Sequence, residues 1–332
     1  MKHSYSISYK NVALKPISDG ELELLRTWRN DPANTKYLRK IPYITPEMQN
    51  RWYESYLANG DEMTFAIFET NQLGRAVGSL SLYDFCDGEA EFGKILIGDS
   101  EAHGRSVGLH ATVAALKIAF AYLKLKKLRL HVFSDNIPAV KVYAKAGFEV
   151  VDEHETNGMK ELTMEISAAE FLSHRPTKDD AYMISFPQCG DARGRMNVVE
   201  GDSKIPFEIK RVFYSYATDR DAIRGQHANR NTEFVMIALA GSCKVRVLDT
   251  AGEEEIFELG SAEQGLYVPR MLWKDMFEFS EDCVLLVLAS EHYDSGEYIR
   301  DLDAYLKMNC HRTTDSLVYG IISHCLVRLQ EE

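Results

Sequence analysis

The sequence has no run of about 18 uninterrupted apolar residues, the length that a transmembrane helix needs. Its first ten residues, MKHSYSISYK, also lack the apolar core of a secretory signal. The six cysteines stand at irregular spacings, and no two of them form a CxxC pair. This pattern predicts reduced thiols and no structural zinc site. We therefore expect a cytoplasmic protein that does not bind a membrane.

Long basic runs are also missing. The 332 residues include 38 Lys and Arg against 50 Asp and Glu, which gives a net charge of −12. The densest basic group is Lys124, Lys126, Lys127 and Arg129. An acidic chain without a basic stripe is poorly suited to bind the phosphates of a nucleic acid. A local basic pocket for one small phosphorylated ligand is still compatible with this charge.

The remaining composition, 45% apolar and 27% charged, is that of a globular protein, and the length predicts two domains. Residues 1–172 alternate strand and helix signals, which predicts a mixed sheet with flanking helices. A polar linker, 173–181, precedes short strands separated by turn residues over 182–308, which predict an all-β antiparallel sandwich or barrel. The fold class is therefore α+β. An apolar stretch in the tail, 309–332, is compatible with one more helix.

Three helices are predicted in more detail because they bear on the site. Apolar residues at helical spacing predict one long, mostly buried helix over residues 107–125. A shorter helix is expected over Pro138–Ala146, with Pro at its start and Gly147 at its end. In the second half, a helix is expected over residues 296–307.

One candidate ligand loop joins a strand to the long buried helix. Over residues 101–108 it reads EAHGRSVG, and Gly104, Ser106 and Gly108 keep its side chains small. Free N–H groups at the start of a helix can bind a pyrophosphate. On its own this pattern equally fits a tight strand-to-helix turn.

A second segment, residues 134–148, contains Asn136, Ala139, Tyr143 and Gly147-Phe148 in the spacing N-x-x-A-x-x-x-Y-x-x-x-G-F. With this motif, residues 10–168 resemble the GNAT superfamily of acyl-CoA-dependent N-acyltransferases. Residues 24–32, LLRTWRNDP, also resemble its ribosomal-protein-acetylase branch. The resemblance implies a GNAT fold that binds coenzyme A as acyl-CoA. The residues implied at coenzyme A are Ile97, His103, Gly104, Arg105, Ser106, Val107, Gly108, Asn136 and Ala139. The family loop usually begins with Arg or Gln and has Gly at its fourth place, where this chain has His103 and Ser106.

The resemblance also implies that Tyr143 protonates the leaving thiolate. A neutral amine attacks a thioester carbonyl, and backbone N–H groups on an opened strand can hold the oxyanion. A phenol in hydrogen-bond reach can then protonate the sulfur. The alternative for Tyr143 is a core tyrosine on a short helix. Glu91 and His131 are candidate bases, although structural hydrogen bonds on strands are the simpler interpretation of both, and we keep Glu91 as a candidate substrate-binding residue.

In the second half, residues 224–233, RGQHANRNTE, followed by Gly241, have the spacing of a cupin strand pair. A metal-binding cupin would have histidines at 227 and 229, a glutamate near 233 and a later histidine. This chain has His227 and Glu233, but Asn229 replaces the second histidine and Lys274 replaces the later one. We therefore expect no metal. A lone His227 would also fit a histidine that lines a barrel.

Residues 182–307 further resemble the dTDP-4-keto-6-deoxyhexose 3,4-ketoisomerases, which are metal-free cupins. The similarity runs through KRVFY at 210–214, RGQHA at 224–228, GLYVP at 265–269, Trp273, and LASEHYD at 288–294, and ends with YIRD at 298–301. In that family a pair of histidines moves a proton between sugar carbons, and asparagine cannot do so near neutral pH. The resemblance implies a sugar-nucleotide pocket with impaired isomerase chemistry. Its candidate residues, including arginines for the diphosphate, are Arg211, Tyr214, Arg224, His227, Asn229, Arg230, Tyr267 and Lys274.

Both resemblances lead to one substrate class. The leading hypothesis is an N-acyltransferase that acts on the amine of a dTDP-3-amino-3,6-dideoxyhexose for surface polysaccharides such as O-antigen and lipopolysaccharide. The acyl group is acetyl or 3-hydroxybutanoyl, and the cupin is a binding module that forms a homodimer. One alternative is a bifunctional enzyme in which His227 alone supports 3,4-ketoisomerisation. A lower alternative is a protein N-terminal acetyltransferase with the cupin as a partner-binding domain.

Overall fold

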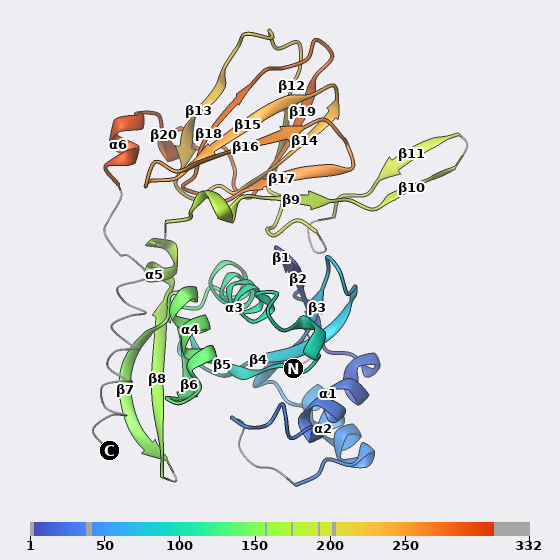
Figure 1. The fold of residues 1–332 in the computed structure, drawn as a ribbon, viewed down its shortest axis with the longest axis vertical. Helices are drawn as coiled ribbons and strands as arrows, with labels where there is room; N and C mark the ends of the chain where they lie inside the picture. Colours follow the sequence, from blue (N-terminus) through green and yellow to red (C-terminus); the bar gives the residue numbers. More distant parts are fainter. Residues whose placement is uncertain are drawn as a thin grey trace. The chain divides into compact units, whose positions relative to one another are not determined.

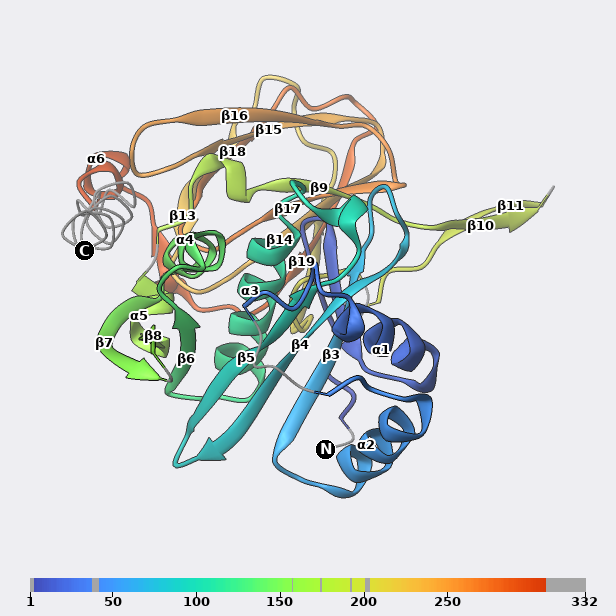
Figure 2. The ribbon, with the colours of Figure 1, turned by 60° about the horizontal axis from the view of Figure 1, so that its bottom comes forward.

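The computed structural model describes residues 3–37, 42–156, 158–173, 175–191, 193–200 and 204–308. They divide into two compact units, one before and one after residue 174 (Figures 1 and 2). Each unit is described by itself below. The helix predicted in the tail, 309–332, lies outside the described residues.

The first unit is built on an eight-stranded sheet in the order β1-β2-β3-β4-β5-β6-β8-β7. All neighbouring strands are antiparallel except β5 and β6, which are parallel. The strands are β1 (Ile7–Tyr9), β2 (Val12–Pro16), β3 (Glu62–Glu69), β4 (Arg75–Cys86), β5 (Glu89–Ile97), β6 (Lys127–Phe133), β7 (Glu149–Thr156) and β8 (Met159–Ser167). The mixed sheet expected from the sequence is therefore present.

In the described part of this unit, five α-helices accompany the sheet: α1 (Leu22–Asn30), α2 (Pro46–Ala58), α3 (Val107–Lys117), α4 (Ile137–Ala146) and α5 (Ala168–Ser173). The start of α2 follows local rules, because Thr45 accepts a hydrogen bond from the Met48 N–H and Pro46 occupies the first turn. Trp28 of α1 and Tyr56 of α2 pack with Ala66 and Ala76 of the sheet. Helices α1 and α2 therefore cover one face of the sheet.

The helix predicted over residues 107–125 is present from Val107 to Tyr122, but only its first part is α-helical. Helix α3 ends at Lys117, and a π-helical turn follows over Ile118–Tyr122. The N–H of Leu123 bonds to the carbonyl of Ile118, five residues back, at 2.9 Å. Ile118, Ala119 and Phe120 are buried, as are the four residues before them in the last turn of α3. The 3.6-residue period of apolar residues does not distinguish such a π-helical turn from an α-helix.

The second unit is all-β apart from short helical segments. One sheet has the order β12-β19-β14-β17-β9, a second has the order β16-β15-β18-β13-β20, and β10 and β11 form a separate hairpin. The strands are β9 (Tyr182–Ser185), β10 (Gln188–Asp191), β11 (Gly194–Asn197), β12 (Arg211–Ser215), β13 (Arg224–Asn229), β14 (Phe234–Ala240), β15 (Cys243–Leu248), β16 (Glu254–Leu259), β17 (Gln264–Val268), β18 (Trp273–Phe277), β19 (Val284–Ala289) and β20 (Tyr298–Ile299). All pairings are antiparallel, as the cupin interpretation expects.

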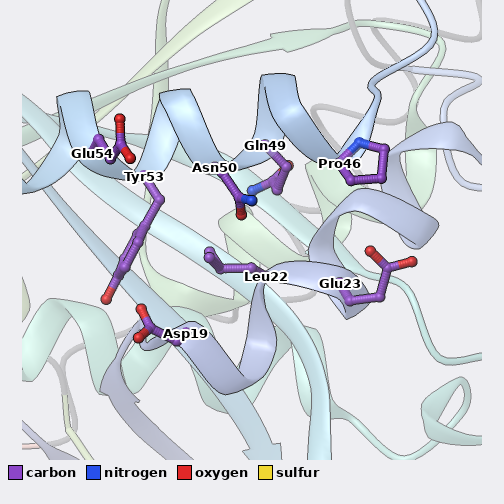
Figure 3. Close-up of a pocket in the computed structure, with 8 residues that line it drawn as sticks. All are labelled: Asp19, Leu22, Glu23, Pro46, Gln49, Asn50, Tyr53 and Glu54. Carbon is purple, nitrogen blue, oxygen red and sulfur yellow. The ribbon is translucent and has the colours of Figure 1, made fainter.

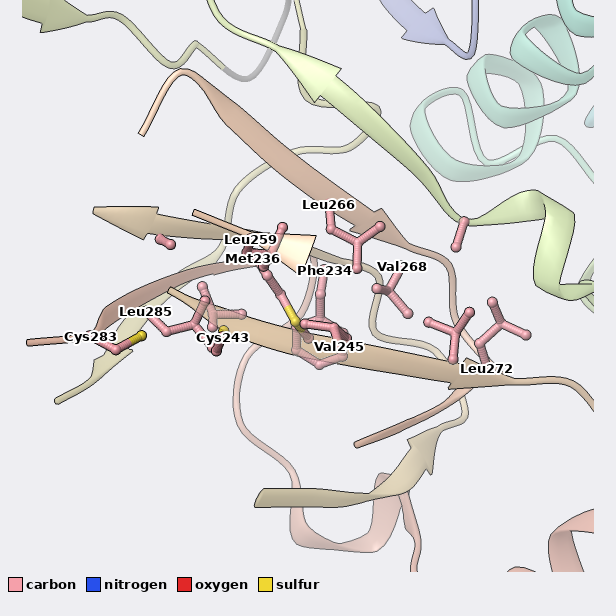
Figure 4. Packing of buried hydrophobic residues seen from close by; sticks show 14 of the residues in the cluster. Phe234, Met236, Cys243, Val245, Leu259, Leu266, Val268, Leu272, Cys283 and Leu285 are labelled. Carbon is pink, nitrogen blue, oxygen red and sulfur yellow. The ribbon is translucent and has the colours of Figure 1, made fainter. Parts of the chain in front are cut away.

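The core of this unit lies between the two five-stranded sheets (Figure 4). Phe234 and Met236 of β14 pack there with Val245 and Val247 of β15. The intervening Val235 points to the opposite face of its sheet, into a second apolar cluster. No strand pairing among the described residues joins the two sheets, so they form a sandwich rather than a closed barrel.

The helix predicted over residues 296–307 is also wrong in part. A 3-10 turn over Ser295–Glu297 leads into strand β20, and helix α6 spans only Leu302–Leu306. Asp301 caps α6 by accepting a hydrogen bond from the Ala304 N–H at 3.0 Å.

No helix in the described part of the chain is long and apolar enough to cross a membrane.

Candidate active site and sugar pocket

The centre of the first unit contains an opening between two neighbouring strands. Parallel strands β5 and β6 pair only from Glu89 to Glu91, so the ladder stops there. On the other side of β5, the register with β4 shifts between residues 96 and 93, and Lys94 has a positive φ of 52°. This geometry is a β-bulge, which takes backbone groups out of the ladder. The result is an opened strand, and its role in holding an oxyanion stays a prediction.

The candidate pyrophosphate loop leads from β5 into α3. Gly104 and Ser106 have positive φ values of 78° and 58°, and Ser106 is the N-cap of α3 without a side-chain cap bond. The first N–H groups of α3 are therefore not satisfied by a capping side chain. His103 contacts the Ile97 carbonyl at 3.1 Å, which ties the loop to the end of β5. Uncapped N–H groups in a left-handed bend suit an anionic ligand.

The side chain of Arg105 is engaged elsewhere in this loop. It donates to the Glu101 carbonyl at 2.7 Å and to the side chain of Gln72. Val107 is buried, whereas a Cβ atom placed on Gly108 would meet no other atom within 4 Å. Arg105 therefore holds the loop in shape in this conformation, and its contact with coenzyme A stays a prediction.

Tyr143 lies on α4 at the mouth of the split between β5 and β6. Its ring meets Phe92 edge-on at a centroid distance of 6.0 Å, and Phe92 directly follows the last residue of β5 paired to β6. Phe148 packs on it in the same way at 6.1 Å. The side chain is buried, and burial raises the pKa of the phenol above its ordinary value. No described residue hydrogen-bonds the phenol, so its proton remains available to a ligand.

Asn136 has a structural role at the start of α4. Its side chain accepts from the Ala139 N–H at 3.4 Å, as an N-cap residue does. The amide oxygen of Asn136 therefore forms the cap of α4, whereas its amide nitrogen takes no part in the cap. Asn136 and Ala139 follow the end of β6, the other strand that borders the split.

The two candidate bases make the structural hydrogen bonds that their simpler interpretation expects. The Tyr83 hydroxyl donates to Glu91, and His131 contacts the Thr163 hydroxyl at 3.2 Å. Glu91 is also the last residue of β5 that pairs with β6. A role of Glu91 toward an acceptor stays a prediction.

In the second unit, His227, Asn229 and Lys274 come together on the core-facing side of β13 and β18. We refer to these three residues as the inner-face cluster. His227 pairs across the strands with Lys274. The Lys274 amine donates to the Asn229 side-chain oxygen at 2.6 Å and lies 4.5 Å above the ring of Phe234. The two positions at which this chain departs from the ketoisomerase pattern are therefore in direct contact.

The electrostatics of the inner-face cluster are unusual. Lys274 is 3% exposed, and burial lowers its pKa to about 7. Burial, and after it the charge of Lys274, lower the pKa of His227 to about 4. The amide nitrogen of Asn229 is buried and has no partner among the described residues. The cluster thus contains a neutral imidazole at neutral pH and an unused donor.

The other predicted sugar-site residues do not all join this cluster. Arg224 and Arg230 are exposed at the two ends of β13, and Tyr214 is exposed on edge strand β12. Arg211, at the start of β12, has a buried Nε without a partner in the described chain. Tyr267 lies in the apolar cluster on the opposite face of its sheet and donates to Glu233 at 2.9 Å. The structure therefore separates Tyr267 from the inner-face cluster.

Three residues at these sites were not named as site residues from the sequence. Lys94 forms the bulge, Phe234 lies below Lys274, and the Tyr298 ring is tilted against that of His227 at a centroid distance of 4.7 Å. Their roles depend on strand register, which a single sequence does not specify at this precision. In the described residues, no three His, Cys, Asp or Glu side chains are grouped to hold a metal.

A cavity of about 490 Å³ lies elsewhere, between α1 and α2 (Figure 3). Its lining includes three carboxylates, Asp19, Glu23 and Glu54. Glu23 is paired with Arg26, and Asp19 accepts from Tyr53. None of the predicted site residues lines this cavity, and it belongs to neither candidate site.

Comparisons with known proteins match the two units separately. Residues 11–149 match the model of the acetyltransferase (GNAT) domain, and residues 179–310 match the model described as FdtA: WxcM-like, C-terminal. The chain is 42% identical over 125 residues to the TDP-4-oxo-6-deoxy-alpha-D-glucose-3,4-oxoisomerase of Aneurinibacillus thermoaerophilus, an alignment that covers 38% of this chain and 89% of that protein.

Two further proteins are similar to one half of the chain each. The acetyltransferase PseH of Campylobacter jejuni is 27% identical over 137 residues, which cover 41% of this chain and 82% of PseH. The solved structure of WlaRA, a TDP-fucose-3,4-ketoisomerase from Campylobacter jejuni, is 40% identical, with a TM-score of 0.38, and covers 39% of this chain and 96% of WlaRA.

Proposed function

Because the chain belongs to the FdtA, WxcM-like family through residues 179–310 and carries a GNAT acetyltransferase domain over residues 11–149, we propose that it is a sugar-nucleotide N-acyltransferase. It moves an acyl group, acetyl or 3-hydroxybutanoyl, from acyl-CoA to the amine of a dTDP-3-amino-3,6-dideoxyhexose. The second unit binds the sugar nucleotide and has impaired isomerase chemistry. The protein works as a cytoplasmic homodimer in surface polysaccharide synthesis.

The observation that carries the acyl-transfer step is the phenol of Tyr143 at the split between β5 and β6, which no described residue hydrogen-bonds. The bulge at Lys94 presents backbone groups that can hold an oxyanion beside it. The phenol is protonated at neutral pH, as a proton donor to a leaving thiolate must be, and burial raises its pKa further. The uncapped start of α3 suits the pyrophosphate of coenzyme A.

The substrate class is supported by the second unit. The relative with 42% identity there is by name an oxoisomerase of a TDP-linked sugar. In this chain, Asn229 cannot exchange a proton near neutral pH, and its oxygen is occupied by Lys274. The second unit still resembles a sugar-nucleotide enzyme but lacks one proton carrier. Such a unit can hold the sugar nucleotide for the proposed acyl transfer without converting it.

The test is mass spectrometry after the full chain is incubated with acetyl-CoA or 3-hydroxybutanoyl-CoA and a dTDP-3-amino sugar. The expected product is heavier by the acyl group, and Tyr143→Phe should strongly reduce its formation. A peptide with a free N-terminus serves as the competing acceptor. Acylation of the peptide without acylation of the sugar would refute the proposal and favour a protein acetyltransferase.

A further inference from the structure

The turn between β1 and β2 contacts the candidate pyrophosphate loop, residues 101–108, through one side chain. Lys10 and Asn11 form this turn. The side-chain N–H of Asn11 donates to the Arg105 carbonyl at 3.1 Å, across 94 positions of the chain. In a planar trans peptide the carbonyl and the next N–H point in opposite directions. The N–H of Ser106 therefore points away from Asn11, and it donates to no described residue.

The amide group of Asn11 is held in this orientation by two further contacts. Its oxygen faces Nδ1 of His110, near the start of α3. Its nitrogen also donates to the carboxylate of Glu69, a residue that is 1% exposed. That carboxylate accepts three backbone N–H groups of the next turn, between β3 and β4, at 2.7–3.2 Å. Because a carbonyl oxygen only accepts, the nitrogen of Asn11 has to face Arg105, and its oxygen then takes the proton of His110.

The backbone of Ser106 explains why the loop needs such support. Ser106 has φ 58° and ψ 15°, in the left-handed region. This conformation is unfavourable for a residue with a Cβ atom, whereas glycine adopts it readily. The loop of the GNAT family usually has glycine at this place. A hydrogen bond that fixes the preceding peptide favours the left-handed conformation over the alternatives, so Asn11 compensates in part for the missing glycine.

We propose that Asn11 is a positioning residue for the acyl-CoA donor, because it holds the peptide between Arg105 and Ser106 and so directs the Ser106 N–H at the pyrophosphate. The inference rests on the proposed function, in which this loop binds acyl-CoA. An N–H that is already oriented loses less conformational freedom when an anion binds. Because this role concerns the pyrophosphate and not the thioester, loss of Asn11 should weaken donor binding and leave the chemical step unchanged.

The experiment measures the dissociation constant of CoA for the full chain by calorimetry. Asn11→Ala should weaken CoA binding by about tenfold, the upper end expected for one hydrogen bond. The φ of Asn11 is not positive, so alanine fits its backbone. In steady-state kinetics, KM for acetyl-CoA should rise by a similar factor, while kcat at saturating acetyl-CoA stays unchanged.

Asn71→Ala is the matched control. Asn71 lies in the neighbouring turn between β3 and β4, and its exposed side chain makes no hydrogen bond with the described residues. This variant should bind CoA like the wild type. Asn11→Asp is the second test variant, because aspartate has the same shape and accepts from His110 but offers no N–H to the Arg105 carbonyl. It should bind CoA at least as weakly as Asn11→Ala, and thermal unfolding checks that each variant is folded.

Ser106→Gly tests whether Asn11 acts through this peptide. In the Ser106→Gly background, Asn11→Ala should weaken CoA binding by about threefold or less, because glycine adopts the left-handed conformation without help. A tenfold loss in both backgrounds would overturn this inference, and so would wild-type affinity in Asn11→Asp.

A second ligand locates the affected contact on the donor. The ligand 3′-dephospho-CoA keeps the pyrophosphate, so Asn11→Ala should weaken its binding by the same factor as that of CoA. A loss for CoA alone would assign the effect to the 3′-phosphate and would contradict the role of Asn11 at the pyrophosphate. Absence of CoA binding by the wild type would overturn the proposed acyl transfer together with this inference, whereas equal binding by the wild type and Asn11→Ala would overturn the inference alone.

Discussion

The substitution Tyr143→Phe tests the acyl-transfer mechanism with the least disturbance to the fold. The ring keeps its edge contacts with Phe92 and Phe148, because only the hydroxyl oxygen is removed. That hydroxyl has no hydrogen-bond partner among the described residues, so no internal bond is lost. A general acid contributes about 10²-fold or more to a rate, which equals about 2.7 kcal/mol of activation free energy at 10²-fold.

The assay measures thiol release from acyl-CoA with a saturating amino-sugar acceptor. We expect kcat to fall by about 10²-fold, while KM for acyl-CoA stays nearly unchanged because the phenol acts in the transition state. Tyr122→Phe is the control, since Tyr122 lies in the π-helical turn after α3. Thermal unfolding of Tyr143→Phe should match the wild type.

The pH dependence gives a second readout of the same residue. The ordinary pKa of a tyrosine phenol is about 10, and burial raises the pKa of Tyr143 above it. The phenol therefore stays protonated at every pH below about 10. The rate should therefore not decline between pH 7 and about 9 through loss of this acid. Wild-type kcat in Tyr143→Phe, with an intact fold, would remove Tyr143 from the mechanism.

Three further predictions address binding and stability. Arg224→Ala should raise KM for the sugar nucleotide and leave KM for acyl-CoA unchanged, and an unchanged sugar KM in steady-state kinetics would argue against nucleotide binding at β13. Asn136→Asp keeps the oxygen that caps α4, whereas Asn136→Ala should lower the free energy of unfolding by about 1 kcal/mol. If the amide nitrogen of Asn136 binds coenzyme A, both variants should raise KM for acyl-CoA. A normal KM in Asn136→Asp would contradict that contact. Because the pKa of Lys274 is about 7 in the fold and about 10.4 in the unfolded chain, the unfolded state holds more protons in between. The stability of the wild type relative to Lys274→Met should therefore rise from pH 7 to 10, by up to about 1.4 kcal/mol per pH unit, and a flat difference in urea unfolding would show that the amine is not desolvated.

Much of the first unit follows from local signals in the sequence. Pro138 and Gly147 mark the ends of α4, and the structure places Gly147 at φ 103° as its left-handed cap. The predicted helix over Pro138–Ala146 carries Tyr143, and the structure has α4 at Ile137–Ala146 with Asn136 as its N-cap. Turn residues likewise predicted that the second unit consists of short strands, as it does. These features depend on neighbours within a few positions, so a single sequence contains the relevant information.

Other features were decided by tertiary contacts. The π-helical turn after Lys117, the bulge at Lys94 and the end of pairing between β5 and β6 arise from how distant strands and helices align. Tyr267 shows the same limit, because the period-2 alternation of β17 turns it to the opposite face from the inner-face cluster. The residue type alone does not show to which face of the sheet the Tyr267 side chain points.

The inner-face cluster shows both contributions together. The sequence alone determined that this chain has Asn229 and Lys274 where its family has histidines. Only the antiparallel pairing of β13 with β18 decided that the two side chains, 45 positions apart, form one hydrogen bond at 2.6 Å. The physical reason is that strand register, which is set by the packing of the whole sandwich, selects the side chains that face each other across a core.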